Sequence, residues 1–339
     1  MNKNERIEEI KEIEERRNSK LICYITGDRG GFETGITKDV INLFYEHLLL
    51  IGNVENIDLL IYSTGGDTLA AFAIVKHLRE FCEKFSVLIP YKALSAATLI
   101  AIGADEIYMT KLGELSPVDS SVTTPYNPTM PNQPPNEPLK FLPVNMEEVT
   151  GYINLAKHKV GLKEEISLNS ILQTLSQRIH PLSLGSVYRA REQVGMLAKK
   201  LLEYHLKDEN DLKTIINTLT KDLYSHDYLF TRSEVKESLK LNVIETDIEL
   251  EKLVWELYKL YTNELELDKP FSPEVFLGSE NNKIGDFKRV YLESIKRTDI
   301  YITKKRIKRT QIQLPGVPTP QSAFQEELIF QGWTTEKNN

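Results

Sequence analysis

The sequence predicts an α/β domain with a largely parallel sheet, and three observations carry this prediction. Short apolar runs of strand length occur at 21–26, 57–62, 86–90 and 106–109. Segments with apolar residues at helical spacing lie between these runs. The run at 57–62 is apolar almost throughout, which is typical of a parallel strand covered on both faces. The alternation indicates one sheet with helices packed against it.

The elements of this core are expected in chain order. A charged helix at 5–17 comes first, and its isoleucines at every third position form a narrow apolar stripe. That stripe predicts a helix that docks on the body or on a sister subunit, with a solvated helix as the alternative. Gly52 ends the next helix, and Asp67 is the expected N-cap of the one after. The expected order is strand 21–26, helix 38–52, strand 57–62, helix 67–84, strand 86–90, helix 95–104 and strand 106–109.

The chain changes character from Thr123 onward. Seven prolines fall between Pro125 and Pro143, which predicts an exposed, partly extended loop of a length that is often functional. Helical patterns and then two alternating strands follow it. The expected helices are 146–160, 164–178, 185–204, 212–223, 233–239 and 247–264, and the expected strands are 287–295 and 300–307.

Seven basic residues lie from Lys296 to Arg309. We interpret them as an edge strand protected by charge, in preference to an arm that binds nucleic acid. The tail after Pro315 is expected to be loose, apart from a docking segment at Ile329–Trp333. The predicted organisation is an N-terminal helix (1–20), a core (21–122), a Pro-rich loop (123–143), a helical part of the same domain (144–245), a helix and strand extension (246–315) and a flexible tail (316–339).

Composition excludes several classes of protein. The 339 residues carry a net charge of −7, so no general attraction to nucleic acid or anionic lipid is expected. Cys23 and Cys82 form no disulfide framework, and a reducing cytoplasm fits them. No apolar run reaches the ~18 residues of a membrane span. No P-loop, GxGxxG or HExxH pattern occurs, so neither a cofactor nor a metal is implied.

Two strand-to-helix junctions could carry chemistry. Gly65 and Gly66 follow a buried strand, and two glycines can turn successive N–H groups toward one point, where an oxyanion could sit. The alternative is a tight turn without chemistry. Ser95 follows the next strand and begins a helix of small residues, whose free N–H groups favour a developing anion. The alternative for Ser95 is an ordinary N-cap.

A family resemblance becomes visible when the two junctions are considered together. The ordered set TGGD, then YKALSAATLIAIGADEIYM, then LGELSPVD, resembles the Clp-fold serine peptidases. The nearest group is the serine dehydrogenase proteinase family, related to signal peptide peptidase A and to the proteolytic subunit of Clp protease. Further segments, such as ICYITGDRGG and ESIKRTDIYIT, extend the resemblance over about residues 5–310. It implies a ClpP/crotonase-like β-α superhelix core with an α-rich C-terminal extension.

The resemblance also implies roles for individual residues. Ser95 would be the nucleophile, and the backbone of Gly65 and Gly66 the oxyanion hole, with the N–H of Ala96 as a further donor. Two positions depart from the family pattern. Ala97 stands where many relatives have glycine, and Leu94 places no polar group beside the serine.

The general base is the open assignment. Clp-type enzymes use a histidine in the segment that here reads LSPVDSSV, which contains none. Relatives of signal peptide peptidase A use a lysine further along, and Lys140 is the candidate at a comparable spacing, ahead of Lys157 and Lys159. His180, at a helix break before Pro181, is the alternative base or a structural cap, and His226 is a weaker candidate of the same kind.

The predicted function is therefore that of a cytoplasmic serine peptidase that hydrolyses peptide bonds in peptides or proteins through an acyl-enzyme. The resemblance implies a homo-oligomer, trimer-based or a ring, with no nucleic-acid partner and no membrane span. A catalytically silent Clp-fold scaffold or peptide-binding protein is the first alternative. A crotonase-type acyl-CoA enzyme, which would share the fold and the oxyanion hole, is the second.

Overall fold

The computed structural model describes residues 3–119, 121–133, 138–162, 164–222, 228–245, 247–313 and 321–337. The chain divides into two compact units, each described here by itself. The first joins Met1–Leu115 to Leu229–Asn339, and the second is Ser116–Tyr228.

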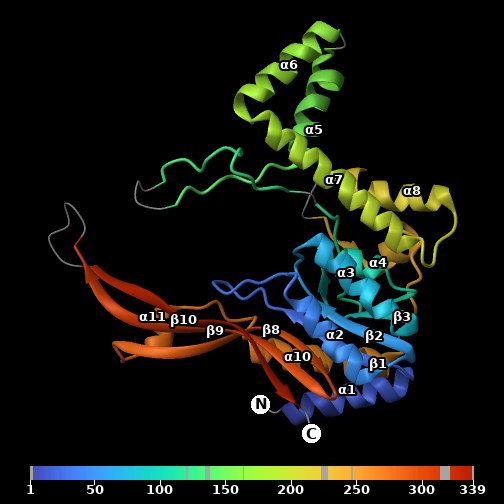
Figure 1. Ribbon diagram of the computed structural model, residues 1–339, viewed down its shortest axis with the longest axis vertical. Helices are drawn as coiled ribbons and strands as arrows, with labels where there is room; N and C mark the ends of the chain where they lie inside the picture. Colours follow the sequence, from blue (N-terminus) through green and yellow to red (C-terminus); the bar gives the residue numbers. More distant parts are fainter. Residues whose placement is uncertain are drawn as a thin grey trace. The chain divides into compact units, whose positions relative to one another are not determined.

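The first unit is built on a seven-stranded mixed sheet of order β10-β9-β8-β1-β2-β3-β5 (Figure 1). Strands β1, β2, β3 and β5 are parallel to one another, whereas β8, β9 and β10 are added in antiparallel fashion beside β1. The predicted α/β class and the parallel core are confirmed. The bounds are β1 Lys20–Thr26, β2 Val54–Tyr62, β3 Cys82–Ile89, β5 Glu106–Met109, β8 Asn282–Ser294, β9 Arg297–Ile312 and β10 Gln321–Lys337.

Helices cover both faces of this sheet because alternate side chains of each strand point to opposite faces. Helices α1 (Lys3–Arg17) and α10 (Ile248–Leu265) pack on the face that carries Cys23. On the other face, Tyr24 meets Phe44 of α2 (Val40–Ile51) edge to face. Helices α3 (Thr68–Arg79) and α4 (Ala96–Ile102) continue the layer of α2, and every residue of α4 is buried.

The N-terminal helix docks on the body of the first unit. Ile10 and Ile13 of α1 are fully buried against the sheet and α10. Of the two interpretations of its isoleucine stripe, docking on the body is therefore confirmed over a solvated helix. The predicted helix ends at Gly52 and Asp67 are also confirmed: the Gly52 N–H donates to the carbonyl of Leu48, and the Asp67 carboxylate accepts from the Leu69 and Ala70 N–H groups.

Shorter elements complete the first unit, and helices make up most of the second. The first unit also holds a small sheet of order β4-β6-β7. In the second, residues 123–143 form no helix where they are described, and the isolated bridges Val122–Val144 and Thr129–Phe141 tie their two arms. The remaining elements of the first unit are β4 Lys92–Ala93, β6 Glu114–Leu115, β7 Phe230–Thr231, α9 Arg232–Glu237 and α11 Pro273–Leu277. Those of the second unit are α5 Met146–Asn154, the π-helix η1 Leu155–Val160, α6 Glu165–Arg178, α7 Pro181–Leu202, α8 Glu209–Asn217 and the π-helix η2 Thr218–Asp222.

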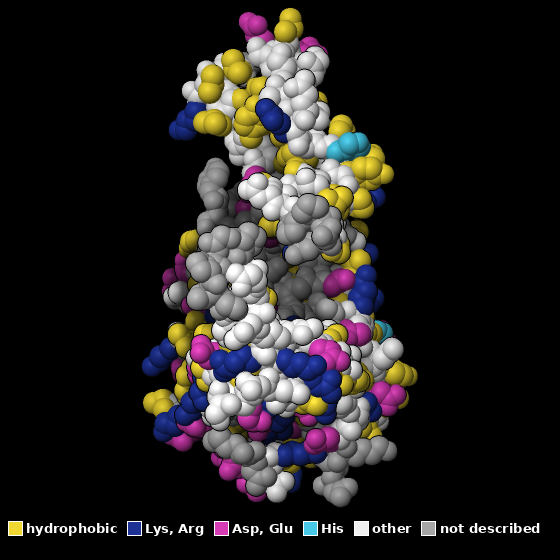
Figure 2. Space-filling model, turned by 90° about the vertical axis from the view of Figure 1, so that its left-hand side faces the viewer, with side chains coloured by type: hydrophobic (Ala, Val, Ile, Leu, Met, Phe, Trp, Pro, Cys, Tyr) yellow, Lys and Arg dark blue, Asp and Glu magenta, His cyan; other side chains and the backbone are white. Residues whose placement is uncertain are grey.

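The interpretation of the basic run as an edge strand is wrong. The run lies on β9, which pairs with β8 on one side and β10 on the other. Its charges are matched by carboxylates of these neighbours: Lys305 with Glu326 and Arg306 with Glu327, each at 2.8 Å. Figure 2 shows basic and acidic side chains intermixed on the face that it views. Lys304, Lys305 and Arg306 of β9 thus pair with carboxylates of the neighbouring strands.

The prediction of a loose tail is wrong for residues 321–337, which form β10. This strand pairs with β9 along its whole length, with one bulge at Ile329. Trp333, in the predicted docking segment, packs on Tyr301 and donates its indole N–H to Asp39 at 2.7 Å. Pairing with β9 therefore makes residues 321–337 a strand, although their sequence shows no clear alternation.

Candidate active site

The two junctions predicted from the sequence lie side by side in the first unit. The N–H of Ser63, at the end of β2, donates to the Lys92 carbonyl, and the Leu94 N–H donates to the Ser63 carbonyl, both at 2.9 Å. A Cβ added to Gly65 would lie 2.8 Å from the Cβ and 3.3 Å from the Oγ of Ser95. Only a glycine leaves room for the Ser95 side chain over this turn.

Ser95 has a backbone conformation that serine rarely adopts. Its φ is 51° and its ψ is −114°, at the N-cap position of α4. An ordinary N-cap residue is extended and accepts a hydrogen bond from its helix, as Asp67 does for α3. The Ser95 side chain makes no such cap hydrogen bond. Strained residues of this kind, which destabilise a fold by about 1–3 kcal/mol each, cluster at functional sites.

Gly66 is enclosed by backbone. Its φ is 143°, and an added Cβ would lie 2.3 Å from the carbonyl oxygen and 2.4 Å from the nitrogen of Ile36. The Ile36 N–H donates to the Gly65 carbonyl at 2.7 Å, and the Asp67 N–H donates to the Ile36 carbonyl at 2.8 Å. Because the Gly65–Gly66 peptide is trans, its N–H points opposite to its carbonyl. The Gly66 N–H therefore points away from Ile36.

The three N–H groups expected to line an oxyanion hole differ in their surroundings. The Gly65 N–H donates to the Ser63 hydroxyl at 3.1 Å. The Gly66 N–H points away from Ile36. The Ala96 N–H belongs to the first turn of α4, where helix N–H groups have no intrahelical acceptor. Of the three, the Gly65 N–H thus has an acceptor within its own turn.

The candidate bases, Lys140 and His180, belong to the second unit. Lys140 lies in the Pro-rich segment, where its backbone is held by Gln133 and Met130 and its side chain is exposed. His180 is the N-cap of α7: its Nδ1 accepts from the Leu182 N–H at 3.1 Å. This is the capping role that the sequence offered as the alternative to a base, and it explains why α7 begins at Pro181 rather than at the predicted Gly185. The weaker candidates Lys157 and Lys159 lie in η1, and His226 lies outside the described residues.

A buried Ser–His–Asp group, which the sequence did not reveal, lies in the first unit away from these junctions. His47 of α2 contacts Ser294 Oγ through Nδ1 at 2.8 Å and Asp299 through Nε2 at 3.0 Å. Burial alone would raise the pKa of Asp299, but hydrogen bonds from His47, Arg297 and Thr335 hold it below its usual value. None of the three members of the group is more than 2 % exposed. A substrate cannot reach them, so the group joins α2 to β8 and β9.

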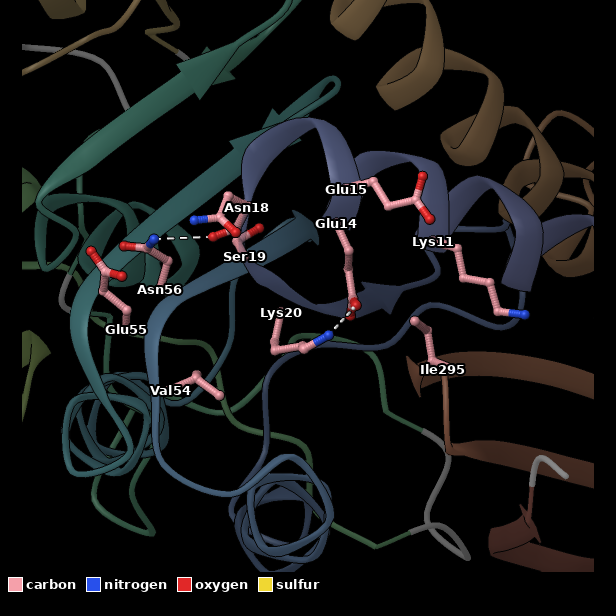
Figure 3. Close-up of a pocket in the computed structure, with 10 residues that line it drawn as sticks. All are labelled: Lys11, Glu14, Glu15, Asn18, Ser19, Lys20, Val54, Glu55, Asn56 and Ile295. Atoms are coloured by element: carbon pink, nitrogen blue, oxygen red, sulfur yellow. Dashed lines mark hydrogen bonds and ion pairs between the residues drawn. The ribbon is translucent and has the colours of Figure 1, made fainter.

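A pocket of about 510 Å³ lies at the opposite edge of the sheet, where β1 and β2 begin (Figure 3). Four of its polar residues bind one another in pairs: Lys20 Nζ lies 2.9 Å from the Glu14 carboxylate, and the Asn56 side chain donates to the carbonyl of Asn18 at 3.0 Å. The Gly65 and Ser95 junctions instead follow the carboxyl ends of β2 and β3. Ligands of open α/β sheets bind at that carboxyl edge.

These features define a class of protein: an α/β fold that holds a strained serine, at a strand-to-helix turn, beside a glycine turn. The family of ClpP-like SDH-type serine proteinases matches residues 1–131. This match agrees with the resemblance that the sequence predicted, and the family it points to is one of serine proteinases.

The chain also resembles individual proteins in sequence or in structure. Uncharacterized protein MJ1495 of Methanocaldococcus jannaschii is 29% identical over 259 residues, covering 74% of this chain and 75% of its own length. Uncharacterized protein MJ0137 of the same organism is 27% identical over 262 residues, covering 76% of this chain and 78% of its own length. Similar structures include a mutant of the membrane-bound stomatin-specific protease 1510-N (17% identity, 68% of this chain and 83% of that chain) and ClpP1 from Listeria monocytogenes (15%, 71% and 97%), each with a TM-score of 0.35. Within the ranges described here, no helix is long and apolar enough to cross a membrane.

Proposed function

We propose that this protein is a serine peptidase that cleaves peptide bonds through an acyl-enzyme on Ser95. The observation that carries the proposal is the contact between the strained Ser95 turn and Gly65. A serine at such a turn presents its hydroxyl to a substrate instead of capping its own helix. Attack of Oγ on a peptide carbonyl forms a tetrahedral anion, which expels the amine to leave an ester that water then hydrolyses.

We further propose that the Gly66 and Ala96 N–H groups receive this anion, with Gly65 as the residue that makes room for Ser95. Two N–H groups fixed in advance stabilise charge as it develops, and losing one such donor reduces turnover by about 10²–10³-fold in other serine peptidases. The positive end of the α4 dipole would act in the same direction.

A fluorophosphonate probe tests this proposal without knowledge of the substrate. We expect covalent labelling of the folded protein, mapped by mass spectrometry to Ser95, and none of the Ser95→Ala variant. Ser176→Ala, which removes a serine on α6, is the matched control and should label like the unmodified chain. Absence of labelling in the folded protein would instead support the silent scaffold, and thermal stabilisation by coenzyme A would support the crotonase-type enzyme.

For the base we propose Lys140, with His180 as the alternative. Lys140→Arg keeps the charge but cannot accept a proton near neutral pH, and His180→Asn keeps an N-cap but removes the imidazole. We expect Lys140→Arg to slow probe labelling by about 10²–10⁴-fold, the usual contribution of a general base, and His180→Asn to leave it near the original rate. The reverse pattern would assign the base to His180, and two unchanged rates would exclude both residues.

We also propose that the protein acts on peptides or proteins in the cytoplasm as a homo-oligomer, trimer-based or a ring. Its second unit leaves apolar side chains in solvent, including Ile166 at 80% and Val160 at 64% exposure. Residues 166–177 of α6 contain no charged side chain. Exposed apolar surface depleted of charge is typical of the centre of protein interfaces.

A further inference from the structure

We propose that Ser63 is a positioning residue that holds the Gly66 N–H toward the site of the anion. The proposal rests on the proposed function and adds to it a residue that touches neither substrate nor nucleophile. Ser63 lies two residues before Gly65, at the end of β2, and its side chain is fully buried.

The Ser63 hydroxyl contacts both polar groups of Gly65. It accepts from the Gly65 N–H at 3.1 Å and donates to the Gly65 carbonyl at 3.3 Å. Ile36 holds the same carbonyl from its own N–H at 2.7 Å. The Gly65 carbonyl and the Gly66 N–H belong to one planar peptide. Ser63 and Ile36 together therefore fix the plane that sets the direction of the Gly66 N–H.

The orientation of the Ser63 hydroxyl is itself fixed. A serine hydroxyl has one proton to donate and two lone pairs that accept. Thr26 Oγ1, at the end of β1, donates to Ser63 Oγ at 2.8 Å and occupies one lone pair, and the Gly65 N–H occupies the other. The single proton of Ser63 is left for the Gly65 carbonyl. Thr26 is also fully buried, so water does not compete for these bonds.

The flexibility of the two glycines explains why the peptide between them needs these hydrogen bonds. Gly65 and Gly66 have φ values of 119° and 143°, and no side chain restricts their rotation. Without the Ser63 hydroxyl, the Gly65 N–H loses its acceptor and the peptide that follows it loses one of its two supports. The donor to the anion would then be present in only part of the molecules.

The test compares two variants of Ser63 by the rate of fluorophosphonate labelling and by melting temperature. Ser63→Ala removes the hydroxyl and little volume, so we expect labelling to slow roughly 10- to 100-fold, the effect of a small misplacement of a catalytic group. Because the Gly65 N–H and the Thr26 hydroxyl lose a buried acceptor, we also expect the melting temperature to fall, as it should for the loss of another buried hydroxyl. Ser63→Thr keeps the hydroxyl but adds a methyl group to a filled site. We expect it to lower the melting temperature and to keep labelling within a few-fold of the original rate.

Thr110→Val is the control for the loss of a buried hydroxyl elsewhere, because Thr110 donates to the carbonyl of Pro90 rather than to the glycine turn. It should label at the original rate. Labelling of Ser63→Ala at that rate, or a loss no greater than that of Thr110→Val, would overturn the positioning role while leaving the proposed peptidase intact. Failure of the unmodified protein to label would overturn both.

Discussion

Replacement of Gly66 by alanine is expected to abolish probe labelling and to destabilise the first unit. The new Cβ would lie within 2.4 Å of the nitrogen and carbonyl oxygen of Ile36, and backbone atoms cannot move aside as a flexible side chain can. Overpacking of this kind destabilises by about 1–3 kcal/mol. Strain at a φ of 143° adds about 1–3 kcal/mol. Chemical denaturation with a folded-state probe, together with fluorophosphonate labelling, measures the two effects.

Gly52→Ala separates strain from steric overlap. Gly52 ends α2 with a φ of 79°, and an added Cβ would meet nothing within 4 Å. We expect this variant to be destabilised by the backbone strain alone, with no steric overlap, and to label at the original rate. If Gly66→Ala were no less stable than Gly52→Ala and still labelled, the enclosed turn would not hold the oxyanion donor.

The parallel core could be predicted because its signals are local. The run at Ile57–Tyr62 is buried on both faces and is therefore apolar except at Asp58. Asp67 and Gly52 mark helix ends through hydrogen bonds to neighbours in sequence. Strand β10 could not be predicted in this way. Its pairing partner is β9, a different segment of the chain, so its own sequence carries little of the information that makes it a strand.

The candidate site shows the same division. Ser95 and the glycine pair stand out from the sequence, because a serine or two glycines directly after an apolar strand is a recognisable pattern. The different surroundings of Gly65 and Gly66 depend on Ile36, from a segment that follows β1, and no spacing in the sequence reveals that contact. The contacts of His47 with Ser294 and Asp299 could not be predicted either, since these partners lie on strands near the other end of the chain.

The buried ion pair of α1 is a further feature hidden by local sequence. In the charged N-terminal helix, Arg6 resembles the solvated residues around it, yet its side chain is only 4% exposed. It donates to Glu293 of β8 from Nε at 2.7 Å and from a terminal nitrogen at 3.1 Å. Glu293 is fully buried and also accepts from Tyr261 and Thr298, each at 2.7 Å. Burial alone would lower the pKa of Arg6, but the hydrogen bond and charge of Glu293 raise it.

Glu293→Gln is therefore expected to destabilise the first unit by about 3–5 kcal/mol, because it leaves a buried guanidinium without its main counter-charge. Glutamine is nearly isosteric, and its carbonyl oxygen can still accept two of the four hydrogen bonds that Glu293 accepts, so the loss reports charge and hydrogen bonding rather than volume. Urea denaturation of the whole chain, followed by circular dichroism, measures it. Glu336→Gln is the matched control. Glu336 lies on β10 and forms an exposed ion pair with Lys3, which belongs to α1 as Arg6 does, and such exposed pairs contribute about 0–1 kcal/mol.

Adding Arg6→Met to Glu293→Gln separates the two origins of the loss. If the unpaired charge is responsible, the double variant is more stable than Glu293→Gln alone, since a buried methionine needs no counter-charge. If the hydrogen bonds to Tyr261 and Thr298 dominate, the second substitution restores nothing. A loss for Glu293→Gln no larger than that for Glu336→Gln would mean that the Arg6–Glu293 pair contributes little to holding α1 on the first unit.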